Sequence, residues 1–291
     1  MSLLQAIILG LIQGLTEFIP ISSTAHLTLA GKLMTAIDPQ RPLIDPQHPD
    51  QWTAFIAVIQ LGTLIAVVVY FWNDILSIIA GFVTANLALI THRPVDDAKR
   101  RRAWLGWLII IGTLPVALVG LLFRHQIEGA LTKNLWVISG SLIGLAVVLT
   151  VAEIVGRQRR GMDDLRIWDA IIVGAAQSFA LIPGSSRSGS TITGGLFAGL
   201  KRETAARFSF LLSIPAIAAS GLLELPKALR SIDTGWLPLV VATIMAGVSG
   251  YLTIAFLLRY LARHTTYVFV AYRIALGLLL IFLLVSGRVS P

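Results

Sequence analysis

Two apolar stretches of this chain are each interrupted by polar side chains that could do chemistry. The first interruption reads QGLTEFIPISSTAH over residues 13–26, and the second reads PGSSRSGST over residues 183–191. Glu17 in the first and Arg187 in the second are the most informative residues. A charged side chain inside a long apolar stretch is costly and is usually retained for function. The two interruptions are therefore the candidate functional segments.

The first interruption carries a carboxylate and an amide in register. Gln13 and Glu17 are four residues apart and would share one face of a helix. The Glu17 carboxylate could bind a hard divalent cation or act as a base. Gln13 could add only a neutral ligand or a hydrogen bond. Both kinds of role for Glu17 stay open at this point.

Hydroxyl groups and an imidazole follow Glu17. His26 comes three residues after Ser23, which is the reach of a hydroxyl–imidazole pair if the segment is helical. Ser22 or Ser23 could instead only cap a helix, and a lone histidine is often a buried hydrogen-bonding residue. The position of His26 near Glu17 in a broken apolar helix favours a functional role.

The second interruption has the composition of an anion site. The Arg187 guanidinium can hold two phosphate oxygens with its planar fork. Gly184 and Gly189 let the backbone approach a ligand closely, and the amides at a capped helix start favour an anion. This combination predicts binding of phosphate or diphosphate.

A proline in each stretch indicates how these segments fold. Pro20 and Pro183 each remove a backbone donor in the middle of an apolar stretch, and hydroxyl residues suited to capping a new helix follow. We therefore predict two re-entrant helical hairpins over residues 3–33 and 168–200. Broken backbone at membrane depth is tolerated only against protein or water, so both breaks should line a cavity.

The composition places these hairpins in a membrane. Of the 291 residues, 56% are hydrophobic and 13% are charged, whereas a soluble domain has about 25% charged residues. This disfavours a soluble enzyme, and the net charge of +8 fits cytoplasmic loops beside anionic lipid better than a nucleic-acid binder. Cysteine is absent, which excludes disulfides, thiolate metal sites and cysteine nucleophiles. Six stretches are long and apolar enough to span a bilayer: residues 52–72, 104–123, 135–155, 208–225, 236–258 and 268–285.

An internal repeat relates the two hairpins. Residues 6–13 match residues 170–177 at an offset of 164, and residues 19–23 match residues 182–186 at an offset of 163. We interpret this as a duplication within a single membrane domain over residues 1–291, with halves at about 1–156 and 165–287. Such halves often have opposite orientations in the membrane. The predicted fold is an all-α integral membrane protein with about six transmembrane helices and two re-entrant hairpins in an inverted-topology repeat.

The basic loops test this orientation. Cations cluster at residues 93–102, 157–166, 201–207 and 259–263, which are expected to face the cytoplasm. If the apolar segment 75–90 does not cross the bilayer, the first hairpin enters from outside and the second from inside. If it crosses, both hairpins and the acidic loop at residues 38–50 lie on the cytoplasmic side. The first arrangement agrees better with the charges and is favoured.

Both interruptions closely resemble the two signature motifs of the bacterial undecaprenyl-diphosphate phosphatases of the bacitracin-resistance type. The resemblance covers the whole chain, including the number of spans and the spacing of the motifs. It implies hydrolysis of undecaprenyl diphosphate to the monophosphate and phosphate, which recycles the lipid carrier for peptidoglycan synthesis. It also implies a divalent cation and a site open to the outer, periplasmic face of the bacterial plasma (inner) membrane. The family has Glu or Gln at the position of Gln13 and frequently Gly at that of Ala25.

With this resemblance, the residues receive expected roles. Arg187 and the amides around Ser186 and Ser188 would bind the diphosphate, with Thr191, Ser22 and Thr24 as further binding residues. Glu17, assisted by Gln13, would hold Mg²⁺ or Ca²⁺. The expected catalytic residues are Glu17, Ser23, His26 and Arg187. Two nucleophiles stay open: Ser23 activated by His26, or a water molecule with His26 or Glu17 as its base.

Two other functions are compatible with these sequence features. Inverted repeats with re-entrant hairpins also occur in secondary transporters, so a lipid-carrier flippase or transporter is the alternative from a different class. A different type of lipid phosphatase is the second alternative. The expected partners are the polyprenyl diphosphate lipid and membrane lipid, without nucleic acid, and both a monomer and a homodimer stay open.

Overall fold

The computed structural model describes residues 1–38, 43–44, 49–123, 134–230 and 236–289. Within these residues the fold is entirely helical, with a single isolated bridge between Arg160 and Leu200. The longer helices are α1 (Leu3–Phe18), α2 (Ser23–Ile37), α3 (Pro49–Tyr70), α4 (Trp72–Thr91), α5 (Asp97–Leu122), α7 (Leu135–Val155), α8 (Ile167–Ser178), α9 (Arg187–Phe197), α10 (Arg202–Arg230), α11 (Trp236–Leu261) and α12 (Tyr267–Val285). Two short 3-10 helices cover Met162–Asp164 and Phe179–Leu181.

Each of the six predicted spans forms a long helix, which confirms an all-α membrane protein. Seven described helices are long and apolar enough to cross a bilayer, because α4 joins α3, α5, α7, α10, α11 and α12. The segment 75–90 thus lies within a complete helix of span length. However, α4 follows α3 after only Phe71 and packs along α5 rather than back along α3. One non-helical residue is too short for the chain to reverse direction. This packing therefore favours the arrangement in which α3 crosses the bilayer and α4 does not cross back.

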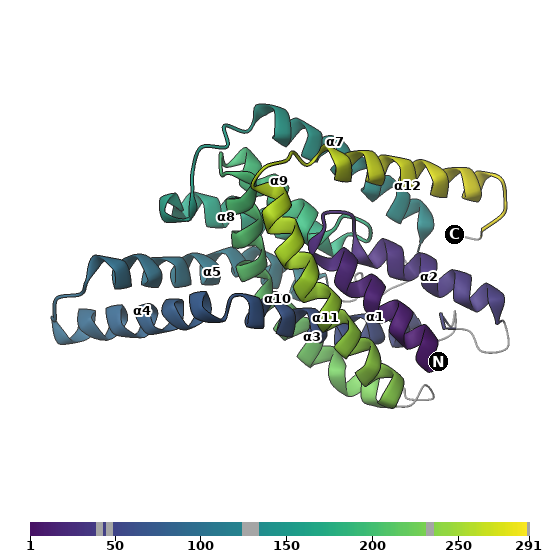
Figure 1. Ribbon diagram of the computed structural model, residues 1–291, viewed down its shortest axis with the longest axis horizontal. Helices are drawn as coiled ribbons and strands as arrows, with labels where there is room; N and C mark the ends of the chain where they lie inside the picture. Colours follow the sequence, from purple (N-terminus) through teal and green to yellow (C-terminus); the bar gives the residue numbers. More distant parts are fainter. Residues whose placement is uncertain (39–42, 45–48, 124–133, 231–235, 290–291) are drawn as a thin grey trace.

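The predicted breaks are also present. Helix α1 ends just before Pro20 and α2 begins at Ser23, while α8 and a 3-10 turn end before Pro183 and α9 begins at Arg187. In Figure 1 the turns of the two hairpins lie near the middle of the molecule, and α1 and α2 extend from there to the right. The α4–α5 pair projects to one side, and α7 and α12 lie side by side at the opposite edge. The elements around the hairpins are thus α3, α5, α7, α10, α11 and α12.

Glycines at equivalent repeat positions allow each hairpin to pack closely on a span. A Cβ added at Gly10 would lie 2.8 Å from the Met245 Cβ, so α1 depends on this glycine to approach α11. A Cβ added at Gly174 would lie 2.9 Å from the Gly112 Cα, so α8 approaches α5 in the same way. Close packing of small residues is how helices associate in a bilayer, where no hydrophobic driving force acts between them. These two contacts fix where each hairpin sits.

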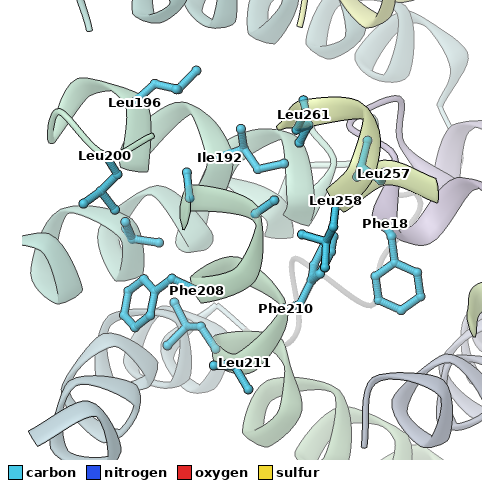
Figure 2. Close-up of a cluster of buried hydrophobic side chains, with 14 of the residues drawn as sticks. Phe18, Ile192, Leu196, Leu200, Phe208, Phe210, Leu211, Leu257, Leu258 and Leu261 are labelled. Carbon is cyan, nitrogen blue, oxygen red and sulfur yellow. The ribbon is translucent and has the colours of Figure 1, made fainter. Parts of the chain in front are cut away.

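The largest apolar cluster lies beside the hairpin turns. It brings together buried side chains from α1, α9, α10 and α11, as Figure 2 shows for Phe18, Ile192, Phe210 and Leu257. The rings of Phe18 and Phe210 meet edge to face with centroids 5.1 Å apart. Phe18 directly follows Glu17, so this packing anchors the end of α1 at the candidate site.

Candidate active site

The first hairpin turns through an unusual serine. Ser22 caps α2, and its hydroxyl accepts a hydrogen bond from the Ala25 amide at 3.3 Å. Its φ is +76° and its ψ is +100°, a conformation that L-residues rarely adopt. Such strained residues persist only where their surroundings hold them, and they cluster at functional sites.

The second hairpin has the same device. Ser186 caps α9 with a φ of +69°, and its hydroxyl accepts from the Gly189 amide at 3.1 Å. The two capping serines are 164 residues apart, whereas the motif alignment pairs Ser23 with Ser186 at an offset of 163. The sequence alignment of the two motifs therefore differs by one residue from the alignment of their backbone conformations. The second turn differs in having a 3-10 turn and Gly184 at a φ of +89° before its cap.

The two turns meet, although they are far apart in the chain. The Ser188 hydroxyl donates to the Ile19 carbonyl at 3.1 Å. Arg187 Nη1 lies 3.8 Å from Glu17 Oε1. The structure therefore brings together the acid and the guanidinium that the sequence singles out.

Glu17 is the centre of a small polar network. It is buried, and its Oε2 accepts from Gln13 Nε2 at 2.9 Å and from the Ser23 hydroxyl at 2.7 Å. The expected side-by-side placement of Gln13 and Glu17 is present. The other carboxylate oxygen, Oε1, faces Arg187. This division leaves Glu17 fixed through one oxygen and directed toward the guanidinium with the other.

Arg187 offers a donor that nothing in the described protein uses. Its Nη1 atom is buried and has no hydrogen-bond partner, because 3.8 Å to Glu17 is longer than a hydrogen bond. A buried guanidinium donor without an acceptor is costly. An anionic oxygen bound beside α9 would satisfy it, and the amides at the start of α9 would favour the same charge.

His26 has other partners than Ser23. Its Nδ1 lies 2.7 Å from the Ser22 carbonyl oxygen and its Nε2 lies 2.6 Å from the Tyr272 hydroxyl. The His26 and Tyr272 rings are also stacked, with centroids 5.6 Å apart. The Ser23 hydroxyl is directed to Glu17 instead. In this arrangement the group placed to receive the Ser23 proton is the carboxylate.

The remaining candidate binding residues lie in three places. The Ser186 and Ser188 hydroxyls lie 3.1 Å apart at the start of α9, close to Arg187. Thr24 is half-buried at the second position of α2. Thr191 is fully buried, donates to the Arg187 carbonyl at 2.7 Å and lies 2.5 Å from the Ser209 hydroxyl. Thr191 thus fastens α9 to α10 rather than facing the Arg187 guanidinium.

The donor set suits a cation that takes most of its ligands from elsewhere. Among the described residues no group of three or more His, Cys, Asp or Glu side chains could enclose a metal. Glu17 supplies one carboxylate, and the buried Gln13 Oε1 has no hydrogen-bond partner. Mg²⁺ is commonly bound by one or two carboxylates together with phosphate oxygens and water. The residues present fit such a cation in company with a phosphorylated substrate.

The sequence places Arg273 within an apolar stretch but does not assign it to this site. Arg273 of α12 is fully buried and donates to the carbonyls of Pro20 and Gly184, one in each hairpin turn, at 3.1 Å. A basic residue within an otherwise apolar 19-residue helix was the available signal. The sequence gives no indication of its partners, because they are backbone carbonyls.

Taken together, the fold and the site define a multi-pass helical membrane protein in which a buried acid and a guanidinium face each other between two broken helices. Residues 6–279 match the family model described as Bacitracin resistance protein BacA. The chain belongs to this family. It is 55% identical to an undecaprenyl-diphosphatase of Syntrophobacter fumaroxidans, over 95% of each chain. It is 49% and 50% identical to the undecaprenyl-diphosphatases of Chlorobaculum tepidum and Chlorobium luteolum, over the full length of each chain.

Proposed function

We propose that this protein hydrolyses undecaprenyl diphosphate to undecaprenyl phosphate and inorganic phosphate in the bacterial plasma membrane, at a site open to the outer face. The observation that carries the proposal is the buried Nη1 of Arg187, which faces Glu17 near the start of α9 but has no hydrogen-bond partner. A diphosphate supplies the anionic oxygens that this donor lacks. The names of the relatives supply the identity of the lipid.

The roles follow from the contacts. Arg187 and the α9 amides hold the terminal phosphoryl group, and the Ser186 and Ser188 hydroxyls complete that face. Ser23 is the nucleophile, with Glu17 as the acceptor of its proton. Attack on the terminal phosphorus breaks the bond to the bridging oxygen and releases undecaprenyl phosphate. Water then hydrolyses the phosphoserine to free phosphate. All of these residues come from one chain, so the proposal needs no second copy.

A divalent cation, Mg²⁺ or Ca²⁺, belongs to this proposal. Glu17 and Gln13 Oε1 would hold it together with substrate oxygens. When bound, it neutralises charge on the phosphoryl group, which is the main requirement of phosphoryl transfer. Gln13 also orients Glu17 by its hydrogen bond to Oε2.

The lipid chain lies in a groove of about 540 Å³ between α3 and α11. The groove is bordered almost entirely by apolar atoms, including those of Val69, Val248 and Ala66. One wall of the groove lies near the end of α1, because Gly250 packs between the Phe18 ring and Ala66, at 3.1 Å and 3.5 Å from an added Cβ. Phe18 follows Glu17, so this groove is the apolar surface that we assign to the lipid chain.

Phosphate release tests the function. Full-length protein is purified in detergent and given undecaprenyl diphosphate with Mg²⁺ or Ca²⁺, with and without chelator. Arg187→Ala and Glu17→Gln should each lower kcat by about 10²–10³-fold, the usual effect of losing one group that stabilises a transition state. Arg159→Ala, at an exposed arginine, is the matched control. Near-normal activity of either site variant, or no turnover by the unaltered protein, would overturn the proposal.

A further inference from the structure

Arg273 makes an unusual set of hydrogen bonds for a buried cation. Its Nε donates to the Leu142 carbonyl and its Nη2 to the Ser141 carbonyl, both on α7 and both at 3.1 Å. Its Nη1 donates to Pro20 and its Nη2 also to Gly184, again at 3.1 Å. The side chain thus joins α12, α7 and both hairpin turns at one point.

This arrangement is specific to a guanidinium. Taking a cation out of water is costly, and here carbonyl dipoles rather than a carboxylate offset that cost. The planar fork of arginine directs its donors in fixed directions, so it can serve separate carbonyls at once. Lysine would keep the charge but concentrate it at one nitrogen. Arg273 is also fully buried and each of its three nitrogens donates to a backbone carbonyl, so it does not touch substrate.

The two turns are held at equivalent places. Pro20 precedes the strained cap Ser22 by two residues, and Gly184 precedes the strained cap Ser186 by two residues. One guanidinium therefore fixes the same backbone position in both turns, two residues before each strained serine cap. Glu17 lies just before the first of these points and Arg187 just after the second, so their separation depends on both.

We propose that Arg273 is a positioning residue, which holds the two strained turns in register and thereby sets the distance between Glu17 and Arg187. The neighbouring Tyr272 acts in the same direction, because its hydroxyl lies 2.6 Å from His26 Nε2. One turn of α12 is therefore the common support of both hairpins. This inference rests on the proposed function for its kinetic consequence but not for its structural one.

The test measures position and activity separately. The chain has no cysteine, so spin labels at Leu33→Cys on α2 and Phe197→Cys on α9, both exposed positions, report the distance between the hairpins. The variants are Arg273→Lys, which keeps the charge, and Arg273→Gln. The matched control is Leu280→Ala, a fully buried apolar residue of α12 that lies two helical turns after Arg273 and donates no hydrogen bond to either hairpin turn.

We expect Arg273→Lys to broaden the distance distribution and to lower kcat by about ten- to a hundredfold, the usual effect of a small misplacement of catalytic groups. KM should change much less, because the transition state depends more on geometry than the bound substrate does. Leu280→Ala should lower the melting temperature without either change. An unaltered distance distribution in both Arg273 variants, or an equal loss of kcat in Leu280→Ala, would overturn the inference. If neither Arg273 variant changes the distance distribution and both hydrolyse undecaprenyl diphosphate normally, the positioning role of Arg273 is wrong but the proposed function is unaffected.

Discussion

At the scale of single residues, Glu17 receives hydrogen bonds from two side chains that have different chemical capacities. Gln13 can only orient it, whereas Ser23 can lose its proton to it. His26, the base expected from the spacing of the sequence, is instead held between the Ser22 carbonyl and Tyr272. The contacts therefore favour an acid–hydroxyl pair, Glu17 with Ser23, as the nucleophilic unit.

Replacement of Ser23 by alanine distinguishes this unit from an activated water. We expect Ser23→Ala to lower kcat by about 10³-fold or more, because loss of a covalent nucleophile removes the principal route. Terminally labelled diphosphate should leave label on denatured wild-type protein and none on the variant. Ser220→Ala, which removes a hydroxyl bonded only within α10, should be fully active. Activity within tenfold of wild type in Ser23→Ala would assign the attack to water.

The site residues that could be predicted from the sequence are those whose charge is unfavourable in the apolar stretch that surrounds them. Glu17 and Arg187 are charges in apolar surroundings, and the structure places them 3.8 Å apart. The partners of His26 and Arg273 could not be predicted, because they lie 246 residues away or are backbone atoms. Such contacts depend on how α12 packs against the turns, which no local pattern encodes.

At the scale of elements, the two turns depend on capping serines that are both useful and strained. Each serine satisfies an amide at a helix start, but its positive φ opposes the preference of any residue with a Cβ. The sequence predicted helix starts at these places from proline and hydroxyl residues. It could not predict the strain, since serine gives no signal for positive φ as glycine does.

Thermal unfolding can separate cap from strain at Ser22. Ser22→Ala loses the cap, worth about 1 kcal/mol, and keeps the strain. Ser22→Gly relieves backbone strain of about 1–3 kcal/mol and loses only a few tenths of a kcal/mol as a helix cap. The greater conformational entropy of glycine in the unfolded chain offsets part of this gain. In detergent, we therefore expect Ser22→Gly to melt at or above the wild-type temperature and Ser22→Ala below it. Equal destabilisation by both substitutions would show that the turn is unstrained.

At the scale of the whole molecule, ion pairs link the helix ends that the charge pattern predicts to lie on the cytoplasmic side. Asp74 at the start of α4 accepts from Arg207 at 2.8 Å, and Glu153 at the end of α7 pairs with Arg202. Asp169 at the start of α8 pairs with Arg160. All three arginines belong to the predicted cytoplasmic loops. The acids therefore share one side of the protein with them, as the inverted arrangement requires.

Labelling of introduced cysteines tests this orientation. Asp38→Cys after α2 should react with an impermeant reagent added outside intact cells, whereas His92→Cys after α4 should react only after permeabilisation. The expectation follows from the basic residues beyond α4 and from the direct continuation of α3 into α4. Ser2→Cys, at the cap of α1, should behave as Asp38→Cys does. Protection of Asp38→Cys would mean that α4 crosses and that both hairpins enter from inside.

The groove between α3 and α11 bears on which lipid diphosphates the protein hydrolyses. Its floor is formed by glycines, since a Cβ at Gly247 would lie 3.1 Å from the Gly62 carbonyl oxygen. In a bilayer the lipid chain gains little by leaving other lipid, so only close packing can favour a particular chain. Substrates that fill the groove should therefore differ modestly, but measurably, from substrates too short to reach along it.

Val248→Trp places a large ring in this groove at a residue that is 56% exposed. We expect it to lower kcat/KM for undecaprenyl diphosphate by roughly three- to tenfold, the scale of lost packing contacts in lipid surroundings. Farnesyl diphosphate, whose short chain leaves most of the groove empty, should be hydrolysed at the wild-type rate. Val147→Trp, the same change at a 53% exposed position of α7, is the control and should affect neither substrate. If Val248→Trp impairs both substrates equally, the ring disturbs the site itself and the lipid chain lies elsewhere.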